Sequence, residues 1–382
     1  MKDVLSFLIA IIFLAGCNLS TKQKIDETTC KNIEIQQIQD SINFDSVIDS
    51  YEYICLSNKN GYVLGEIEQL VIYENRIYIS SDGVFCFDIE GNPIFKIADK
   101  GHKKSELAEV TSISIQDGVL YVYDEPKQVI HKYNSTTGNF IENIDAPIYA
   151  SGIFKLKGNF VADNYSGYPC EYYKGNARFL ICQDFSNGPL AEYFTEDAYK
   201  IHIKGQLTYN NSYVLLSDYY NNKLYKIDDY NCTLEYCINY KSSNKLSSSE
   251  INKLVSDGQT SMNNSKFQYG LSNVYENENH LVGKCNEGIY SYFLYCKKTN
   301  SVLAFKQYIN SNYQLAPYDF CGCYNDYFIS IFMPDEILCM RDLLGFGKVL
   351  PSSHPDSKKQ KMLMSYDIND NPIIALYKFK KI

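Results

Sequence analysis

The hydrophobic and polar positions of the chain alternate in units that recur along most of its length. Three segments share one order: a strand, a turn containing Asp, a second strand, another turn and a third strand. They span residues 76–97, 119–144 and 213–238. Alternation with a period of two residues runs through all three. This pattern predicts β-strands that each direct one row of side chains into a core.

Weaker copies of the same unit fill the gaps. They begin near Asn159, His280 and Tyr327, and the last copy predicts a strand over Met362–Asp367. Four strands in a repeat of about 40–50 residues are typical of a β-propeller blade. Six units fit between about residue 62 and the C-terminus. We therefore predict an all-β fold, a six-bladed β-propeller with four-stranded blades.

Segments outside the repeat predict how the ring closes and where it is interrupted. We expect the strand-like segment Phe44–Leu56 to pair with the last blade, because closure removes exposed sheet edges. Ser247–Gly258 begins with a capping box and Pro334–Gly345 has proline in its first turn, so both predict short helical insertions. Pro351–Lys361 is rich in Ser, Pro and Lys and predicts a mobile loop.

Residues Met1–Cys17 have the features of a secretory signal. The apolar run Val4–Leu14 is too short to span a bilayer, which takes about 20 apolar residues. It ends in Leu14-Ala15-Gly16-Cys17, which resembles the lipobox of bacterial lipoproteins. That resemblance implies cleavage before Cys17 and acylation of Cys17, and several acyl chains would give a stable membrane anchor. The alternative is a short signal peptide followed by a chance cysteine.

The predicted organisation has three parts. Residues 1–16 are a signal peptide, residues 17–43 a polar tether and residues 44–382 the propeller. Asn18, rather than Asp, follows Cys17. By resemblance to the enterobacterial sorting rule, this implies an outer-membrane lipoprotein. We expect it to face the periplasm, with display at the cell surface left open.

Charge and aromatic content narrow the choice of partners. The 382 residues include 36 Lys and Arg against 45 Asp and Glu, which gives a net charge of −9 and argues against a nucleic-acid partner. Tyrosine occurs 35 times and tryptophan is absent. An AT-rich genome would produce the same tyrosine bias without any selection for binding.

The chain resembles the NHL-like six-bladed β-propeller lipoproteins of Bacteroides-type bacteria. The resemblance is carried by the lipobox, by Ile67–Asp82, by the turn Gly101–Leu107 and by the closing segment Asp370–Lys380. In the turn, Gly101 and Glu106 match the family pattern, whereas its Gly-Pro pair and Tyr are missing. The resemblance implies the fold; members of the group mostly lack an established activity, so it implies no reaction.

Candidate binding residues lie in the loops between second and third strands and in the connections between blades. Tyrosines crowd the loop after Asp163 and the equivalent loop of the next blade, where they suit peptide or sugar binding or, alternatively, pack the loops. The first blade connection adds charged residues, and His102 is the one histidine there that could act as an acid or base. The predicted ligand-binding set is Tyr165, Tyr168, Tyr172, Tyr173, Tyr219, Tyr220, His102, Lys103, Glu106 and Asp124.

No catalytic, metal or cofactor site is predicted. Aspartates at strand ends, such as Asp82, Asp124, Asp163 and Asp218, could ring a central pore as metal ligands, but a short acid after a strand more simply bonds its own turn. Twelve cysteines remain besides Cys17, the closest pair being Cys321 and Cys323. Disulfides are compatible with export, and their pairing does not follow from the sequence.

Three functional hypotheses follow. The first is a membrane-anchored binding or scaffold lipoprotein that uses one loop-rich face to bind an envelope protein, a peptide or a glycan. The second is a propeller hydrolase or lyase acting at the channel mouth. The third is a purely structural subunit of an envelope complex.

Overall fold

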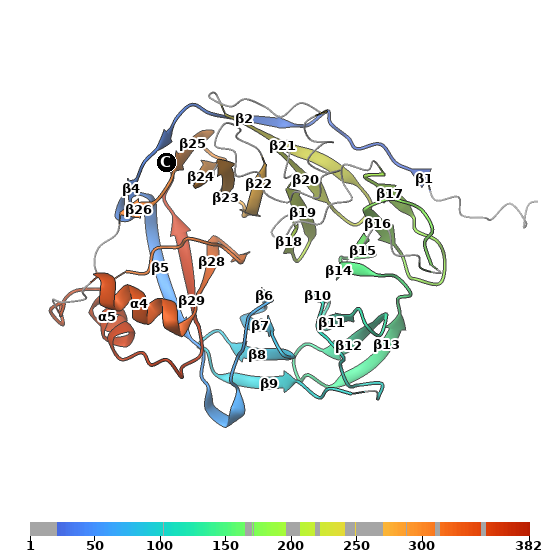
Figure 1. Ribbon diagram of the computed structural model, residues 1–382, viewed down its shortest axis with the longest axis horizontal. Coiled ribbons are helices and arrows are strands. Elements are labelled where there is room, and N and C mark those ends of the chain that lie inside the picture. The colour runs from blue at the N-terminus through green and yellow to red at the C-terminus, as the bar shows by residue number, and fades with distance from the viewer. Residues whose placement is uncertain are drawn as a thin grey trace, which may run out of the picture.

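Six small sheets stand around a common axis and confirm the predicted six-bladed β-propeller (Figure 1). The computed structural model describes residues 21–101, 103–164, 170, 172–195, 207–217, 222–240, 249, 270–287, 289–309, 314–344 and 349–382. In each blade, four antiparallel strands run from the axis outward. The middle strands are buried on both sides because each blade packs between two neighbours; Val84–Phe87 of the first blade are all buried.

The strands of blades 1 to 3, from the axis outward, are β6 (Gln69–Tyr73), β7 (Arg76–Ser80), β8 (Val84–Asp88) and β9 (Pro93–Ile97); β10 (Ser112–Gln116), β11 (Val119–Asp124), β12 (Val129–Asn134) and β13 (Phe140–Asp145); and β14 (Ala150–Lys155), β15 (Phe160–Asn164), β16 (Phe179–Cys182) and β17 (Ala191–Tyr193).

Those of blades 4 to 6 are β18 (Leu207–Asn210), β19 (Tyr213–Ser217), β20 (Lys223–Ile227) and β21 (Cys232–Tyr240); β22 (Leu271–Glu276), β23 (His280–Glu287), β24 (Ile289–Cys296) and β25 (Ser301–Phe305); and β27 (Gly322–Tyr324), β28 (Tyr327–Phe332), β29 (Ile373–Phe379) and β5 (Ile48–Cys55).

Short turns set the register of the inner hairpins. Glu74 and Asn75 have φ angles of 47° and 59°, and Asp117 and Gly118 have φ angles of 51° and 74°. Positive φ at both central positions of a turn matches the twist of paired strands, and Asn, Asp and Gly adopt it at low cost. These residues therefore direct the chain back into the same blade.

The ring closes as the sequence predicts. β5, from the N-terminal part of the chain, pairs antiparallel with β29 from Ile373↔Cys55 to Phe379↔Ile48. Just before β5, the short helix α2 (Phe44–Val47) buries Phe44 completely. Its ring meets those of Tyr51, Tyr308 and Tyr377 at centroid distances of 6.3, 5.6 and 5.8 Å. The closing strand is thus held by backbone pairing and by an aromatic cluster.

Residues 21–43, for which the sequence predicts a polar tether, are instead bound along the outside of the propeller. We call this segment the strap. β1 (Thr21–Lys22), β2 (Lys31–Ile35) and β3 (Ile38–Gln39) add parallel to β17, β21 and β25, and β4 (Ile42–Asn43) pairs with β26 (Tyr308–Ile309) (Figure 1). Ile33 and Ile35 are 2% exposed, so the segment buries apolar side chains while it covers sheet edges.

The helical insertions differ partly from expectation. α4 (Pro334–Leu344) confirms the second predicted helix, whereas the first, Ser247–Gly258, lies outside the described residues except for Ser249. α5 (Ser357–Met364) replaces the predicted mobile loop and the predicted strand at Met362–Asp367. Its Lys, Gln, Met and Leu residues favour a helix, and it buries Leu363. No helix in the described part of the chain is long and apolar enough to cross a membrane.

The side chain of Asn371 joins the last blade to the first, and its hydrogen bonds predict that mutating it lowers the stability of the fold. Asn371 is 2% exposed; its side chain accepts a hydrogen bond from Leu64 N (2.9 Å) and donates to the carbonyls of Ser57 (3.1 Å) and Tyr62 (2.6 Å). Asn371→Ala leaves these buried groups without partners and should lower the free energy of unfolding by about 2–3 kcal/mol. Urea unfolding measures this.

The matched control is Asn369→Ala. The side chain of Asn369 is exposed and donates a hydrogen bond to the neighbouring Asp367 (2.8 Å), while the backbone carbonyl that bonds Asn58 is kept in the variant. It should change stability by less than about 0.5 kcal/mol. Equal losses in the two variants would mean that the Asn371 contacts do not hold the closure.

Candidate functional site

The candidate site is a cavity between blades 1 and 2 on the upper face. We define the upper face as the side that carries the loops between second and third strands and the connections between blades. The cavity has a volume of about 320 Å³, and its ionisable lining residues are Glu68, Asp82, Lys100 and Glu109. Lys100 Nζ lies 3.6 Å from Asp82 Oδ1, and both side chains are exposed. We call this the blade 1–2 cavity.

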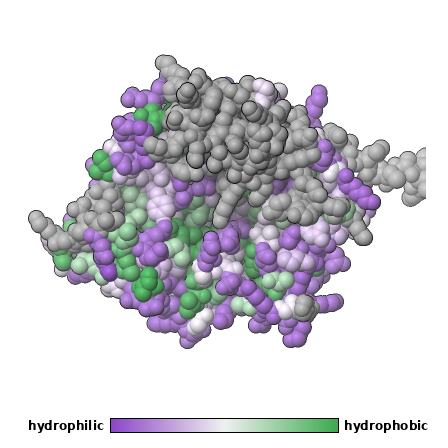
Figure 2. Space-filling model, in the orientation of Figure 1, coloured by the Kyte–Doolittle hydropathy of each residue, from purple (hydrophilic) through white to green (hydrophobic). Residues whose placement is uncertain are grey.

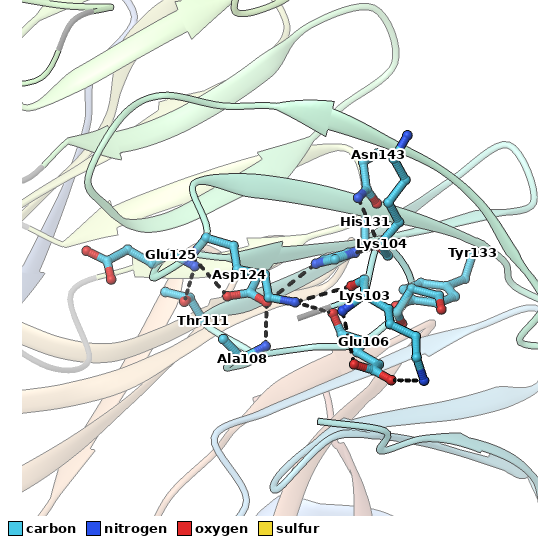
Figure 3. A network of polar contacts seen from close by, with 12 residues as sticks. Lys103, Lys104, Glu106, Ala108, Thr111, Asp124, Glu125, His131, Tyr133 and Asn143 are labelled. Atoms are coloured by element: carbon cyan, nitrogen blue, oxygen red, sulfur yellow. Dashed lines mark hydrogen bonds and ion pairs between the residues drawn. The ribbon is translucent and has the colours of Figure 1, made fainter. Parts of the chain in front are cut away.

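A buried network holds the loop that forms one wall of the cavity, residues 98–111 (Figure 3). Asp124, at the end of β11, and His131, on β12, are both almost completely buried. Asp124 Oδ2 accepts a hydrogen bond from Ala108 N (2.6 Å) and lies 3.4 Å from His131 Nε2. Asp124 therefore faces the loop and His131, and it positions the wall of the cavity.

The direction of the pKa shift of Asp124 agrees with this geometry. Burial opposes ionisation of Asp124, but contacts with His131 and with the N–H groups of Ala108 and Lys127 outweigh it, so the pKa of Asp124 lies below its usual value. Burial, together with the charges of Glu109 and Asp124, raises the pKa of Glu125. Glu109, which lines the cavity, is thus close enough to Glu125 for its charge to act on that carboxyl.

The same network ties down the tip of the loop. Lys104 O lies 3.1 Å from His131 Nδ1 and accepts a hydrogen bond from Asn143 (2.9 Å). Lys127 Nζ donates to Glu106 O (2.7 Å), while the Glu106 carboxylate accepts from Lys103 N (3.0 Å) and pairs with Lys103 Nζ (2.8 Å). Lys103 and Glu106 therefore stabilise the turn itself. His102 lies outside the described residues.

The tyrosines that the structure describes pack their loop onto blade 3. Tyr173 is 8% exposed; its hydroxyl donates to Glu192 (2.7 Å) and accepts from Ala177 N (3.0 Å). Tyr172 donates to Asp184 O (3.3 Å), and its ring lies 5.4 Å from that of Phe185. For these two, packing is what the structure shows. The other predicted tyrosines, Tyr165, Tyr168, Tyr219 and Tyr220, lie outside the described residues, as does Cys17.

Sequence reasoning missed the partners of the strand-end acids. Asp163 is buried against Arg178 (3.1 Å) and accepts a hydrogen bond from Ser151 (2.6 Å). His131, the partner of Asp124, is buried as well. Within the described part of the chain, no three His, Cys, Asp or Glu residues are placed to hold a metal ion.

Two further cavities follow the propeller axis. One, of about 260 Å³, is lined by residues of all six blades and shares Glu68 and Thr111 with the blade 1–2 cavity. The other, of about 440 Å³, lies at the turns on the lower face. There the buried Glu276 accepts hydrogen bonds from Tyr236 (2.7 Å) and Tyr213 (3.1 Å) and pairs with Lys297 (2.7 Å). Sequence reasoning missed this cluster, which the run Glu276-Asn277-Glu278-Asn279 could have indicated.

Hydrophilic and hydrophobic residues both lie on the visible surface of the described residues. Over the face shown in Figure 2, hydrophilic residues surround smaller groups of hydrophobic ones.

Comparison with known proteins identifies the family. A family model described as a domain of unknown function, DUF4934, matches residues 30–378. The chain belongs to the DUF4934 family. A search of curated proteins finds no match.

Solved structures share the fold of this DUF4934 protein. It is similar to a candidate exported protein from Bacteroides fragilis NCTC 9343, with 16% identity and a TM-score of 0.73 over 92% of this chain and 100% of the other. A DUF4221 family member from Bacteroides vulgatus has 12% identity and a TM-score of 0.47 over 87% and 97% of the two chains. BamB from Moraxella catarrhalis has 11% identity and a TM-score of 0.35 over 68% of each chain. The similarity to the Bacteroides fragilis protein shows that the two chains share a fold.

The Asp124 network predicts a pH dependence of stability. Because the pKa of Asp124 is lower in the folded protein, its contribution is complete above the unfolded carboxyl pKa of about 3.9 and is lost as the pH falls through the folded value. Asp124→Asn should cost about 1–3 kcal/mol at pH 7, and this difference should shrink below about pH 4. Urea unfolding at several pH values measures it.

Asp117→Asn is the control, because Asp117 is exposed in a turn of the same blade. Its effect should stay below about 0.5 kcal/mol at pH 7. A cost of Asp124→Asn that did not change with pH would contradict an ionised Asp124 as the centre of the network.

Proposed function

We propose that this protein is an exported, membrane-anchored binding protein whose upper propeller face holds a positively charged segment of a protein or peptide. The observation that supports it best is the blade 1–2 cavity. Three carboxylates, Glu68, Asp82 and Glu109, line it with a single lysine, Lys100. Opposite charge on a partner would steer association and select against acidic competitors.

The wall of the cavity is preorganised. Asp124, His131 and Lys127 fix the backbone of the loop that carries Lys100 and Glu109, so little ordering remains to be done when a partner binds. A volume of about 320 Å³ suits one or two side chains rather than a large ligand. The channel cavity, which shares Glu68 and Thr111, gives a long side chain further space.

The proposed cellular location, or address, rests on the signal-like N-terminus and the Leu14–Cys17 lipobox, and Asn18 favours the outer membrane. The similar protein from Bacteroides fragilis, itself a candidate exported protein, is consistent with export. Thr21, the first residue of β1, follows Cys17 by four positions, so the chain between them reaches at most about 14 Å. An acylated Cys17 would hold the outer edge of blade 3 beside the membrane and leave both propeller faces open at the side.

The hydrolase or lyase reading and the purely structural reading stay predictions. The first requires turnover of a substrate at the channel mouth. The second requires a stable complex that does not depend on the carboxylates of the cavity.

The binding proposal predicts that removing two charges from the cavity weakens capture of the partner. The mature protein is immobilised and exposed to solubilised envelope, and Glu68→Gln/Glu109→Gln is compared with wild type. We expect about a tenfold loss of the captured partner, since two rim charges together contribute about 1.4 kcal/mol. Capture by wild type should also weaken as the ionic strength rises.

The control, Asp49→Asn/Glu52→Gln, changes the net charge equally at two exposed positions of β5. It should retain wild-type capture. If both double variants captured the same partners at the same level, the cavity would not be the binding site.

The anchor predicts a change of partitioning. Cys17→Ala removes the thiol that would be acylated, so the protein should move from the membrane fraction to the soluble envelope fraction. Cell fractionation and labelling with a radioactive fatty acid measure this, with Cys339→Ala as the control for loss of an exposed cysteine. Unchanged partitioning without label would refute the anchor.

A further inference from the structure

Two cysteines that are far apart in the chain meet where the strap joins blade 4. Cys30 immediately precedes β2, and Cys237 lies on β21, the outer strand of that blade. Their Sγ atoms are 2.7 Å apart across a separation of 207 residues. Closing this gap to the ~2.05 Å of a disulfide bond takes a movement of less than about 1 Å.

Backbone pairing on both sides holds the two residues in place. Downstream, β2 runs parallel to β21 from Lys31↔Tyr236 to Ile35↔Tyr240. Upstream, Asp26 bridges Thr233, and Leu234 N donates to Asp26 O (2.9 Å). Lys223 Nζ also lies 3.4 Å from Glu27 Oε1. Cys30 and Cys237 are therefore brought together by the architecture of the strap and not by a chance contact of mobile side chains.

We infer that Cys30 and Cys237 form a disulfide that fastens the strap covalently to blade 4. This inference rests on the proposed function only for the address, because an exported protein meets an oxidising compartment. Neither the binding face nor the acyl anchor is needed for it.

The position of the bond suits a tethered protein. Among the described residues, a pull on the N-terminus would first detach the short strand β1, which pairs with β17 at Thr21 and Lys22. The bridge at Asp26 follows, and Cys30 then lies directly ahead of β2, so a cross-link there would stop the strap from peeling before its longest strand is reached. A force applied at the N-terminus would then act on β21 through the covalent bond rather than on individual backbone hydrogen bonds.

The oxidation requires a disulfide as oxidant. One thiolate attacks a sulfur of the donor disulfide and releases one donor thiol, and the other cysteine then displaces the second donor thiol from the mixed disulfide. Two protein thiols lose two protons and two electrons, and the donor disulfide is reduced to two thiols. Burial and the adjacent Cys237 raise the pKa of the Cys30 thiol, so we expect the bond to form before the strap docks or while it is locally open.

To test the inference, the purified mature protein is treated with oxidised glutathione. Its remaining thiols are alkylated under denaturing conditions, and the protein is digested without reduction. Mass spectrometry should find the peptide of Cys30 linked to that of Cys237, and the link should vanish on reduction. Recovery of both cysteines in alkylated form would overturn the inference.

Limited proteolysis measures whether the bond keeps the strap attached to the propeller. Reduction should increase the rate of cleavage within residues 21–30 at least tenfold in wild type and in the control Cys339→Ser. In Cys30→Ser and Cys237→Ser, cleavage should already be fast and should not respond to the reductant. An equal response to reduction in wild type and in Cys30→Ser would also overturn the inference.

Trapping thiols in intact cells separates this inference from the proposed address. A link found in cells supports both. If the link forms with oxidised glutathione but both thiols are free in cells, the bond does not occur in the cell and export to an oxidising compartment is contradicted, while the carboxylate variants still test the binding face independently.

Discussion

The pairing of β5 with β29 is the contact on which the rest of the structure depends. It joins an N-terminal strand to a C-terminal one, so the six blades form a ring whose members each pack between two neighbours. Because Phe44 and Tyr51 come from the N-terminal side and Tyr377 from β29, the aromatic cluster forms only when both ends of the chain are in place. The first and last blades, and hence the walls of the channel, take their final positions through this closure.

Closing the ring does not protect the outer edges of the blades, and the chain protects them in two ways. The outer strands of blades 3, 4 and 5 are covered by the strap. The outer strand of blade 2 has no added strand among the described residues, and it carries Glu142, Asn143 and Asp145. The outer strand of blade 1 begins with Pro93. Charge and proline discourage edge pairing, so these two outer strands carry protection of their own where the strap does not cover them.

Most of the fold could be predicted from the sequence, and the exceptions share a cause. The alternation in β7, β8, β11 and β12 identifies the blades because each strand is long enough to show a period, and the proline of α4 marks its first turn. The strap strands β1, β3 and β4 have two residues each, too few for a period, and their partners lie far along the chain. α5 was missed because its many lysines resemble a loop when only composition is considered, whereas buried Gln360 and Leu363 define its inner face. The contact between Cys30 and Cys237 depends on the strap and so could not be predicted before it.

In the candidate site, too, contacts between residues far apart in the chain could not be predicted from the sequence. An acid at the end of a second strand could be predicted as a recurring feature, but its role depends on a partner from elsewhere: His131 for Asp124, Arg178 for Asp163 and Lys100 for the exposed Asp82. Only the last of these pairs lines a cavity. The repeat therefore supplies equivalent carboxylates, and the connections between blades decide which are buried as structural groups and which remain accessible to a ligand.

Polar groups on the inner strands extend this argument to the channel. Gln69 exchanges hydrogen bonds with the backbone of Ile113, Ser112 with that of Ile153, and Thr208 donates to Val274 O. Each of these contacts joins one blade to the next. Side chains that could face a ligand in the channel are thus occupied in holding the blades together, because an inner strand whose polar groups lost these partners would pay their desolvation cost. The loops at the rim, in contrast, differ in length from blade to blade while the inner strands keep the same structural task.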